Sequence, residues 1–371
     1  MQNKNFTITQ QGYIPEDRTV GEIIETRLLE LGMKQAELAE ATGITKSVVC
    51  DVIKGNRAIT AEMAVLVECA IGISAFYLLQ VQAKRDIDTA SNSQRVQNMM
   101  SSIYEWQAIK RMLPLAVLKK LEKTKGNVQD NVKAVFEMFN VSSSVELLAL
   151  KSTEQEAYLR RSFKVHFDDS TLFTWKHHCF YESSKVKVGK PFKKENITSL
   201  CDELKRIFYE NNRTYDRVKD TFFQAGIRLL YIDKVGQLPV DGMSFWRDEN
   251  PTIVLTRRLK SVDSFAFSTF HELGHVKYHL KKDDQAFVNF DTSDRDDFES
   301  EADEFALNAF ISKKEWADFM DSIKGINPFA VHPRIKYLAD RKRINPQILF
   351  GRYMHDTNQY RLKRVFETEI K

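Results

Sequence analysis

Two histidines four residues apart, with a glutamate directly after the first, constrain this chain more than any other feature. The segment His271–His275 reads HELGH. On an α-helix this spacing puts both imidazoles on one face, about 6 Å apart along the axis, where they can hold one tetrahedral Zn²⁺. Glu272 lies one step round the helix, close enough to reach a water on such an ion without binding the metal itself. The motif therefore predicts a site for one Zn²⁺ per chain, with Glu272 beside it.

A catalytic zinc site needs a third protein ligand and keeps a fourth position for water. His279 extends the row of histidines, but it lies about 12 Å from His271 along the helix axis, too far for one ion. The longer motif HExxHxxGxxH is excluded because positions 278 and 281 are tyrosine and lysine. The third ligand is therefore expected to be a carboxylate from a later helix.

The helix predicted over Phe298–Ile311 offers three glutamates. On a helical wheel, Glu299 lies about 60° from the centre of the apolar face, Glu301 about 100° and Glu304 about 160°. Glu299 is thus the half-buried candidate for the third ligand, whereas Glu304 is expected to be a surface charge. Asp303 stands one turn above Glu299, where it can accept a hydrogen bond from a ligating imidazole.

These two motifs together resemble the ImmA/IrrE family of zinc-dependent metallopeptidases. The resemblance lies in HELGH followed by an ExEAxxFAxxxF pattern that begins at Glu299, and it covers roughly Ile197–His355. It implies a zincin-like peptidase domain in which His271, His275 and Glu299 bind zinc and Glu272 is the base. The sequence departs from the family pattern after the second motif, where residues 309–312 read AFIS instead of Leu-Leu-x-Pro.

Glycines divide the first ninety residues into short helical segments. Four amphipathic stretches end at a glycine, the residue that favours a left-handed helix cap, and three stretches begin after a threonine or serine cap. The pattern predicts a compact unit of five helices. The predicted ends are Gly32, Gly43, Gly55 and Gly72, and the predicted caps are Thr45, Thr60 and Ser74.

The second and third of these helices resemble a lambda-repressor-like (XRE) helix-turn-helix. Gln35–Val49 reads QAELAEATGITKSVV, with a glycine in the turn, and the continuation through Lys54–Ala64 and Phe76–Gln80 is similar to HigA-type antitoxins. The resemblance implies that a homodimer places the third helix of each copy in the major groove of a double-stranded DNA operator. The DNA contacts that it implies are Gln35, Thr45, Lys46, Ser47, Lys54 and Arg57.

Charge gives this DNA-binding interpretation little support. The chain has 55 Lys and Arg against 51 Asp and Glu, a net charge of +4. Residues 1–90 hold 9 Lys and Arg and 12 Asp and Glu, so this segment carries a charge of −3. Binding to DNA must therefore depend on local charge placement. The alternative is a helical module that only dimerises or holds a protein partner.

The chain divides into three predicted regions. Residues 1–90 form the helix-turn-helix domain, residues 91–195 a helical connecting region and residues 196–371 the peptidase domain. The last region is predicted to begin with helix over Ile197–Gln224. The strands of a small sheet are predicted after it, at Ile227–Ile232, Gly242–Trp246 and Thr252–Thr256, with further helices to follow. The predicted fold class is α+β, mainly α. The adjacent pair His177 and His178 is expected to lie in a core or interface, because neighbouring residues point about 100° apart on a helix.

The hydropathy of the chain and its cysteines indicate where in the cell the protein is expected. No apolar run approaches the roughly 20 residues that span a bilayer, so no membrane partner is expected. The four cysteines are scattered, with no CxxC pair, which fits a reduced, cytoplasmic protein.

The sequence thus predicts an antitoxin-like transcriptional regulator that binds DNA and carries a zinc-dependent endopeptidase domain. Its protein partner is expected to be a specific substrate or a cognate toxin. The alternative is a non-enzymatic antitoxin or repressor whose zinc site is structural or sensory. Glu272 favours the enzyme, because a purely structural site has no need of a base.

Overall fold

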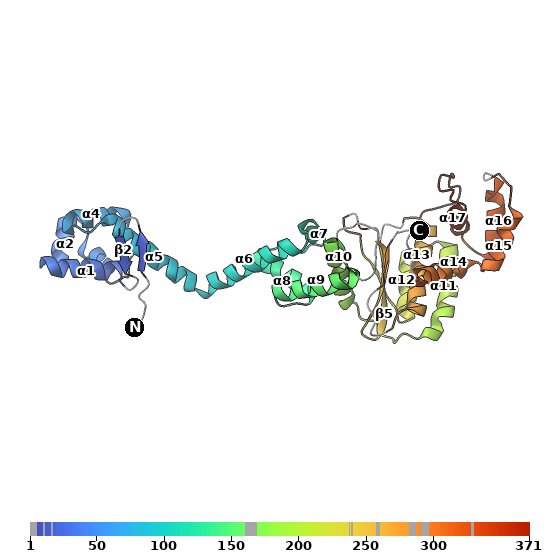
Figure 1. The fold of residues 1–371 in the computed structure, drawn as a ribbon, viewed down its shortest axis with the longest axis horizontal. Helices are drawn as coiled ribbons and strands as arrows, with labels where there is room; N and C mark the ends of the chain where they lie inside the picture. The colour runs from blue at the N-terminus through green and yellow to red at the C-terminus, as the bar shows by residue number, and fades with distance from the viewer. Residues whose placement is uncertain are drawn as a thin grey trace. The chain divides into compact units, whose positions relative to one another are not determined.

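The computed structural model describes residues 6–9, 12–15, 18–159, 169–236, 238, 240–256, 260–281, 287–290, 297–327 and 330–371. Contacts between residues divide the chain into two compact units, Met1–Ile103 and Tyr104–Lys371, which we call the N-terminal and the C-terminal unit. Helices make up most of both units, and the described strands form two small sheets (Figure 1). The predicted α+β class, mainly α, is confirmed.

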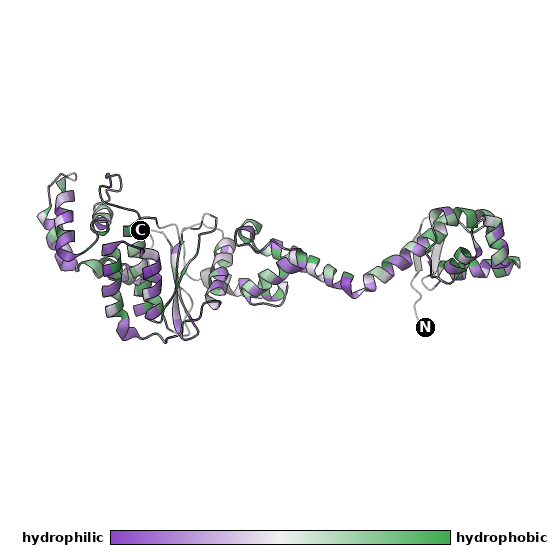
Figure 2. Ribbon diagram, turned by 180° about the vertical axis from the view of Figure 1, so that it is seen from behind, coloured by the Kyte–Doolittle hydropathy of each residue, from purple (hydrophilic) through white to green (hydrophobic). Residues whose placement is uncertain are grey.

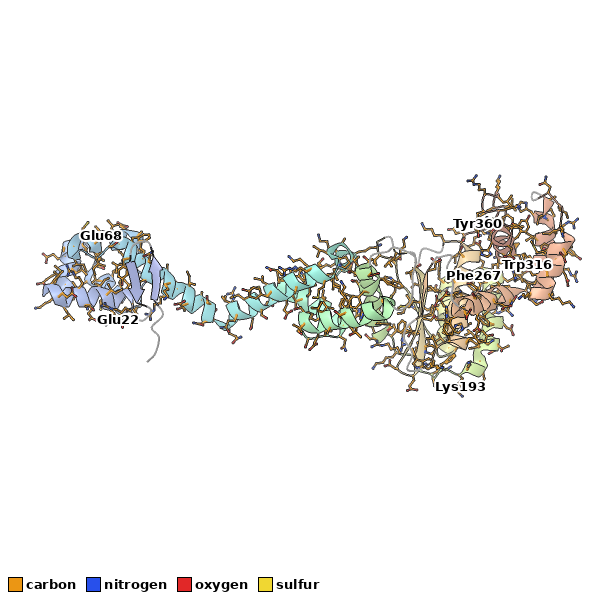
Figure 3. The ribbon with its side chains drawn as sticks, viewed as in Figure 1. Glu22, Glu68, Lys193, Phe267, Trp316 and Tyr360 are labelled. Carbon is orange, nitrogen blue, oxygen red and sulfur yellow. The ribbon has the colours of Figure 1, made fainter. Side chains whose placement is uncertain are left out.

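The N-terminal unit contains the five predicted helices. Its elements are β1 (Phe6–Thr9), β2 (Gly12–Pro15), α1 (Val20–Leu31), α2 (Gln35–Thr42), α3 (Lys46–Ile53), α4 (Ala61–Ile71) and α5 (Ala75–Asn92). Gly32, Gly43 and Gly72 end α1, α2 and α4 with a left-handed backbone, as the glycine pattern predicts. At the start of α1 the Thr19 hydroxyl accepts a hydrogen bond from the N–H of Glu22, a residue labelled in Figure 3. These caps supply partners for helix ends that otherwise lack them.

A close contact between helices fixes the position of α3. A Cβ atom on Gly21 of α1 would lie 1.9 Å from the carbonyl oxygen of Ile53, so glycine is required there. Val49 and Val52 of α3 are buried in the same core cluster as Leu38 of α2. The side of α3 that faces away from this core is exposed, and it includes the residues at the start of the helix.

The C-terminal unit contains most of the remaining helices, and α6 (Gln94–Met112) crosses the boundary between the units. The sequence pattern did not predict α15 or α17. It predicted helix throughout Ile197–Gln224, but the structure breaks this segment, with Asn211 and Arg213 in the left-handed region (φ 42° and 47°). The helices are α7 (Leu115–Lys120), α8 (Val128–Phe139), α9 (Ser144–Leu159), α10 (Asp169–Ser184), α11 (Ile197–Glu210), α12 (Thr214–Gln224), α13 (Val262–Tyr278), α14 (Asp297–Phe310), α15 (Lys313–Ser322), α16 (His332–Lys342) and α17 (Pro346–Asp356).

A four-stranded sheet separates two groups of these helices (Figure 1). Its strands are β3 (Arg228–Tyr231), β4 (Val240–Arg247), β5 (Asn250–Leu255) and β6 (Phe287–Phe290), in the order β3-β5-β4-β6. Only β3 and β5 run parallel among these described pairs. Side chains alternate between the faces: Leu229 and Ile253 pack with α11–α13, whereas Leu230 and Val254 pack with α10. The three predicted strands are present, and β6 was not predicted.

The helical segment before the sheet packs directly on it. Val117 of α7 and Trp175 of α10 share a core cluster with Met243 of β4. Residues 104–195 therefore lie in the same compact unit as the sheet. The division into three domains at residues 90 and 195 stays a prediction, since compactness alone does not define a domain boundary.

None of the described helices is both long and apolar enough to cross a membrane. Figure 2 shows hydrophilic and hydrophobic residues mixed along the helices. All four cysteines are free, and Cys179 and Cys201 are buried.

Of the adjacent histidines of α10, His177 is buried and His178 is partly buried. The ring of His177 packs against Phe139 and Phe173, at centroid distances of 4.9 and 4.7 Å. His178 is largely buried, and burial lowers its pKa to about 4, although the nearby carboxylate of Glu182 opposes the shift. Burial thus keeps His178 neutral in the folded chain near neutral pH.

Acid should destabilise the chain partly through His178. Its pKa of about 4 lies below the ordinary value of 6.5, so the unfolded chain binds the proton more readily and stability is lost as the pH falls from about 6.5 towards 4. We expect the free energy of unfolding of His178→Gln to fall less between about pH 7 and pH 5 than that of the wild type, in denaturant titrations of the full chain. His355→Gln, at an exposed histidine, is the control. Equal pH dependence in wild type and His178→Gln would contradict the assignment.

Candidate metal centre and DNA-binding surface

The helix α13 lies inside the C-terminal unit, against both the sheet and α14. Phe265, Phe270 and Leu273 belong to the main core cluster of this unit. From Phe265 to Val276 every residue is buried except Phe267, which is partly buried. Other elements therefore enclose this stretch on almost every side. The polar side chains of the HELGH motif are therefore buried together with it.

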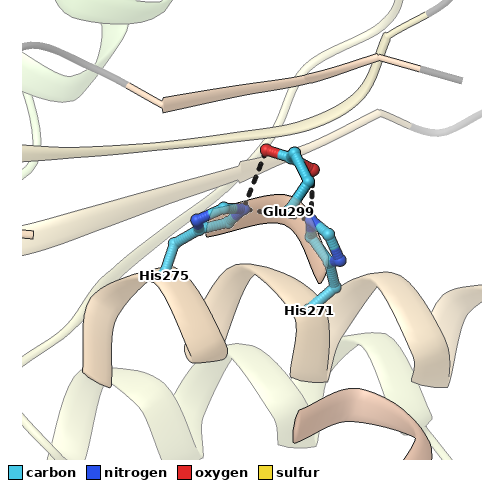
Figure 4. Close-up of side chains that lie close together, drawn as sticks. All are labelled: His271, His275 and Glu299. Atoms are coloured by element: carbon cyan, nitrogen blue, oxygen red, sulfur yellow. Dashed lines mark hydrogen bonds and ion pairs between the residues drawn. The ribbon is translucent and has the colours of Figure 1, made fainter. Parts of the chain in front are cut away.

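Three side chains bring their possible ligand atoms close together: those of His271, His275 and Glu299 (Figure 4). The Nε2 atoms of the two imidazoles lie 3.0 Å apart. The carboxylate of Glu299 lies across both of them, 3.1 Å from Nε2 of His271 and 3.2 Å from Nε2 of His275. The imidazoles are buried, whereas the Glu299 side chain is 21% exposed. Within the part of the chain that the structure describes, this is the one group of three such side chains arranged to hold a metal ion.

The arrangement of these three side chains fits a tetrahedral zinc ion. Ligand bonds of about 2.0–2.1 Å place neighbouring donor atoms about 3.3 Å apart in a tetrahedron, close to the distances here. Two imidazole nitrogens and a carboxylate oxygen are donors that zinc prefers. When their lone pairs converge at such a distance inside a protein, a cation or protons must lie between them.

The outer nitrogens of both imidazoles also have partners. Nδ1 of His271 lies 2.9 Å from Oδ1 of Asp303, the residue that the sequence pattern assigned to this contact. Nδ1 of His275 lies 2.9 Å from Nδ1 of His279, whose Nε2 lies 2.9 Å from Oε2 of Glu301. His279 is therefore not one of the converging donors, as its distance along the helix predicts. Its contacts with His275 and Glu301 were not predicted.

The helix α14 supplies these carboxylates because it packs closely on α13. A Cβ atom on Gly274 would lie 3.1 Å from Cα of Ala302, which is tight for any larger residue. Glu299 lies on the side of α14 that faces the histidines. Glu304 lies on the exposed side and pairs with Lys313 at 3.0 Å, so the expected surface charge is where the helical wheel put it.

Two hydrogen bonds set the protonation of Glu299. Burial alone would raise the pKa of this carboxyl group, but hydrogen bonds from His271 and His275 outweigh that effect and lower it to about 2. Glu299 is therefore an anion at neutral pH, the form that binds a metal ion.

Glu272 lies beside the candidate metal centre, and its side chain points towards β4. The hydroxyl of Ser244 donates a hydrogen bond to its Oε2, while Oε1 is buried and has no hydrogen-bond partner among the described residues. Burial raises the pKa of Glu272 to about 8, although nearby His271 and the Ser244 hydroxyl oppose the shift. Glu272 can therefore take up and release a proton near neutral pH.

Two residues of β4 that the sequence pattern did not single out shape this position. A Cβ atom on Gly242 would lie 2.2 Å from Oε1 of Glu272, so Gly242 provides the space for the carboxylate. Ser244 holds the other oxygen. The segment was predicted as a strand, but a single sequence carries no signal that this strand lies beside α13.

Comparison with known proteins agrees with both parts of the structure. Residues 23–78 match the helix-turn-helix family, and residues 224–343 match the IrrE N-terminal-like domain. The chain joins an XRE-type helix-turn-helix domain to an ImmA/IrrE-like domain. A solved structure, described as a hypothetical protein from E. coli, is 30% identical over 22% of this chain and 86% of its own, with a TM-score of 0.22. The comparison with curated proteins found no match.

The helix-turn-helix domain presents most of the predicted DNA contacts to solvent. The left-handed Gly43 ends α2 and allows the chain to turn into α3, and Thr45 is the N-cap residue of α3, although its side chain makes no capping hydrogen bond. Gln35, at the start of α2, is partly buried. The exposed residues of the predicted set are Thr45, Lys46, Ser47, Lys54 and Arg57.

Zinc binding by the ImmA/IrrE-like domain should depend on Glu299. Glu299→Ala leaves two imidazoles, an incomplete set for tight zinc binding, so we expect it to lose most of the zinc that wild type carries at about one ion per chain. Metal analysis of the purified full chain after dialysis measures this loss. Glu304→Ala, which removes an exposed carboxylate from the same helix, should keep its zinc. Full zinc in Glu299→Ala would show that the ligand assignment is wrong.

Proposed function

We propose that this chain is a DNA-binding transcriptional regulator whose ImmA/IrrE-like domain is a zinc-dependent endopeptidase that cleaves a specific protein partner. The proposal rests on the position of Glu272. This carboxylate is buried next to a His-His-Glu set, and one of its oxygens has no hydrogen-bond partner among the described residues. A metal site that only supports the fold has no need of such a group.

The mechanism assigns a separate task to each side chain. When bound, a zinc ion polarises the scissile carbonyl and acidifies water. That ion would be held by His271, His275 and Glu299, and Asp303 would orient the ring of His271. Glu272 takes a proton from the attacking water and delivers it to the leaving amine.

The helix-turn-helix domain is the DNA-binding part of this function. We propose that it binds double-stranded DNA as a homodimer in the cytoplasm, with Lys46 and Ser47 at the start of α3 towards the bases and Arg57 on the backbone. The exposure of these residues supports this role. The antitoxin-like role, with a cognate toxin as the substrate or partner, rests on the similarity of the first ninety residues to HigA-type antitoxins.

A non-enzymatic antitoxin or repressor with a structural or sensory zinc site is the competing function. It requires the metal ligands but gives Glu272 no task. The cost of a buried carboxylate oxygen without a partner argues against it. The variants below separate the two functions, because they alter Glu272 without touching a metal ligand.

Glu272→Gln should retain zinc and lose proteolysis, by about 10²–10⁴-fold, because it removes the base alone. Gly242→Ala should have a similar effect, since its Cβ would occupy the place of the Glu272 carboxylate. The measurement is cleavage of proteins encoded by neighbouring genes, incubated with the zinc-loaded full chain, together with zinc content. Gly189→Ala is the control, because a Cβ there meets nothing within 4 Å. Cleavage by Glu272→Gln at the wild-type rate would refute the peptidase mechanism.

Lys46→Ala should reduce affinity for the cognate operator and relax its sequence preference, whereas Arg57→Ala should weaken binding to all sequences evenly, as a phosphate contact does. The domain has few basic residues, so its affinity for DNA should depend only modestly on salt. The slope of log binding constant against log salt concentration should be about one per phosphate contact. Gel-shift titrations at two salt concentrations, with the DNA upstream of the protein's own gene and with unrelated DNA, measure the affinity, the sequence preference and the salt dependence. Lys133→Ala, at an exposed lysine of α8, is the control. The absence of any shift at micromolar protein would favour a module that holds a protein partner.

A further inference from the structure

His275 has a partner on each of its two ring nitrogens. Its Nε2 lies 3.2 Å from Glu299, inside the candidate metal centre. Its Nδ1 lies 2.9 Å from Nδ1 of His279, and Nε2 of His279 lies 2.9 Å from Oε2 of Glu301. Three side chains from two helices thus form one continuous row that ends in a carboxylate.

The positions of the protons in this row follow from its chemistry. A histidine that binds a metal through Nε2 must carry its proton on Nδ1. Nδ1 of His275 is then the donor, and Nδ1 of His279 must accept because two N–H groups cannot face each other. His279 therefore carries its proton on Nε2 and donates it to the carboxylate of Glu301. Every hydrogen bond in the row has one donor and one acceptor.

We propose that His279 and Glu301 are positioning residues that hold His275 in the tautomer and orientation needed to bind the metal. This inference rests on the metal site of the proposed function, but not on proteolysis. It gives a task to a histidine that lies too far along the helix to be a ligand. The hydrogen bond to a ligating imidazole fixes its ring and raises its basicity.

The surroundings of His279 suit this task. Its side chain is 2% exposed, and the ring of Phe298 packs against it at a centroid distance of 4.9 Å. His279 is the residue directly after α13. Its backbone N–H donates a hydrogen bond to the carbonyl of His275 at 2.9 Å, which ties it to the last turn of the helix. The Glu301 side chain is 63% exposed, and we expect its loss to matter less than the loss of His279.

The test is zinc affinity, measured on the full chain by competition with a chromophoric chelator. His279→Phe keeps an aromatic ring but removes the acceptor, and we expect it to weaken zinc binding about 10–100-fold. His279→Asn places an amide oxygen near the position of Nδ1 and should restore most of the affinity. Glu301→Ala removes the acceptor for Nε2 of His279 and should weaken zinc binding, though less than His279→Phe, whereas Glu301→Gln keeps an acceptor and should restore the affinity. His355→Phe, the same change at an exposed histidine, is the control.

A second readout detects the tautomer directly. In zinc-loaded protein labelled with ¹⁵N-histidine, two-bond correlations should show His275 protonated on Nδ1 and His279 on Nε2. Wild-type affinity in His279→Phe, equal weakening in His279→Phe and His279→Asn, or the opposite tautomer at His279 would overturn the proposal.

The outcomes separate this proposal from the proposed function. A chain that binds zinc, loses affinity in His279→Phe and cleaves no protein keeps the positioning role and loses only the peptidase. A chain that cleaves its partner, with zinc affinity unchanged in His279→Phe, keeps the peptidase and loses the positioning role. A wild type that binds no zinc refutes both.

Discussion

The candidate metal centre depends on how closely α13 approaches α14. Gly274 permits this approach, because any side chain there would press on the backbone of Ala302. At this separation Glu299 reaches two imidazoles at once, while Asp303 reaches the far side of one of them. A wider gap between the helices would separate the donors, even though each would remain on its own helix. The packing of two helices thus sets the geometry of the site.

Burial makes these contacts necessary. The HELGH motif lies in the main core of the C-terminal unit, where a polar atom without a partner costs about 1–3 kcal/mol. Both ring nitrogens of His271 and of His275 face partners, and Oε2 of Glu272 accepts a hydrogen bond from Ser244. Among the side-chain polar atoms of this motif, Oε1 of Glu272 is the exception. An isolated exception in an otherwise satisfied network indicates an atom kept available for chemistry.

Local patterns in the sequence predicted much of this structure. Glycine caps and amphipathic periodicity predicted the five N-terminal helices, because helix ends and buried faces depend on residues close in sequence. The helical wheel ranked Glu299 above the other glutamates of its helix, and the structure brings it to the two histidines. The same wheel put Glu301 about 100° from the centre of the apolar face and indicated no contact for it, since a wheel gives the direction of Cβ and not the reach of a long side chain. Glu301 is largely exposed and still contacts His279.

Contacts between distant segments could not be predicted in this way. Gly242 and Ser244 lie on β4, and their relation to Glu272 depends on how the sheet packs on α13. The break within residues 197–224 depends on Asn211 and Arg213 in a left-handed conformation that their residue types do not demand. Each of these features belongs to tertiary packing, which a single sequence does not encode in any local pattern.

We expect two imidazoles and one carboxylate to bind a single zinc ion. X-ray absorption spectroscopy at the zinc edge of the full chain tests it most directly, because it reports the type and distance of the ligand atoms. We expect nitrogen and oxygen neighbours at about 2.0–2.1 Å, with the outer-shell scattering of two imidazole rings. A sulfur neighbour at about 2.3 Å, or a spectrum without imidazole scattering, would contradict it.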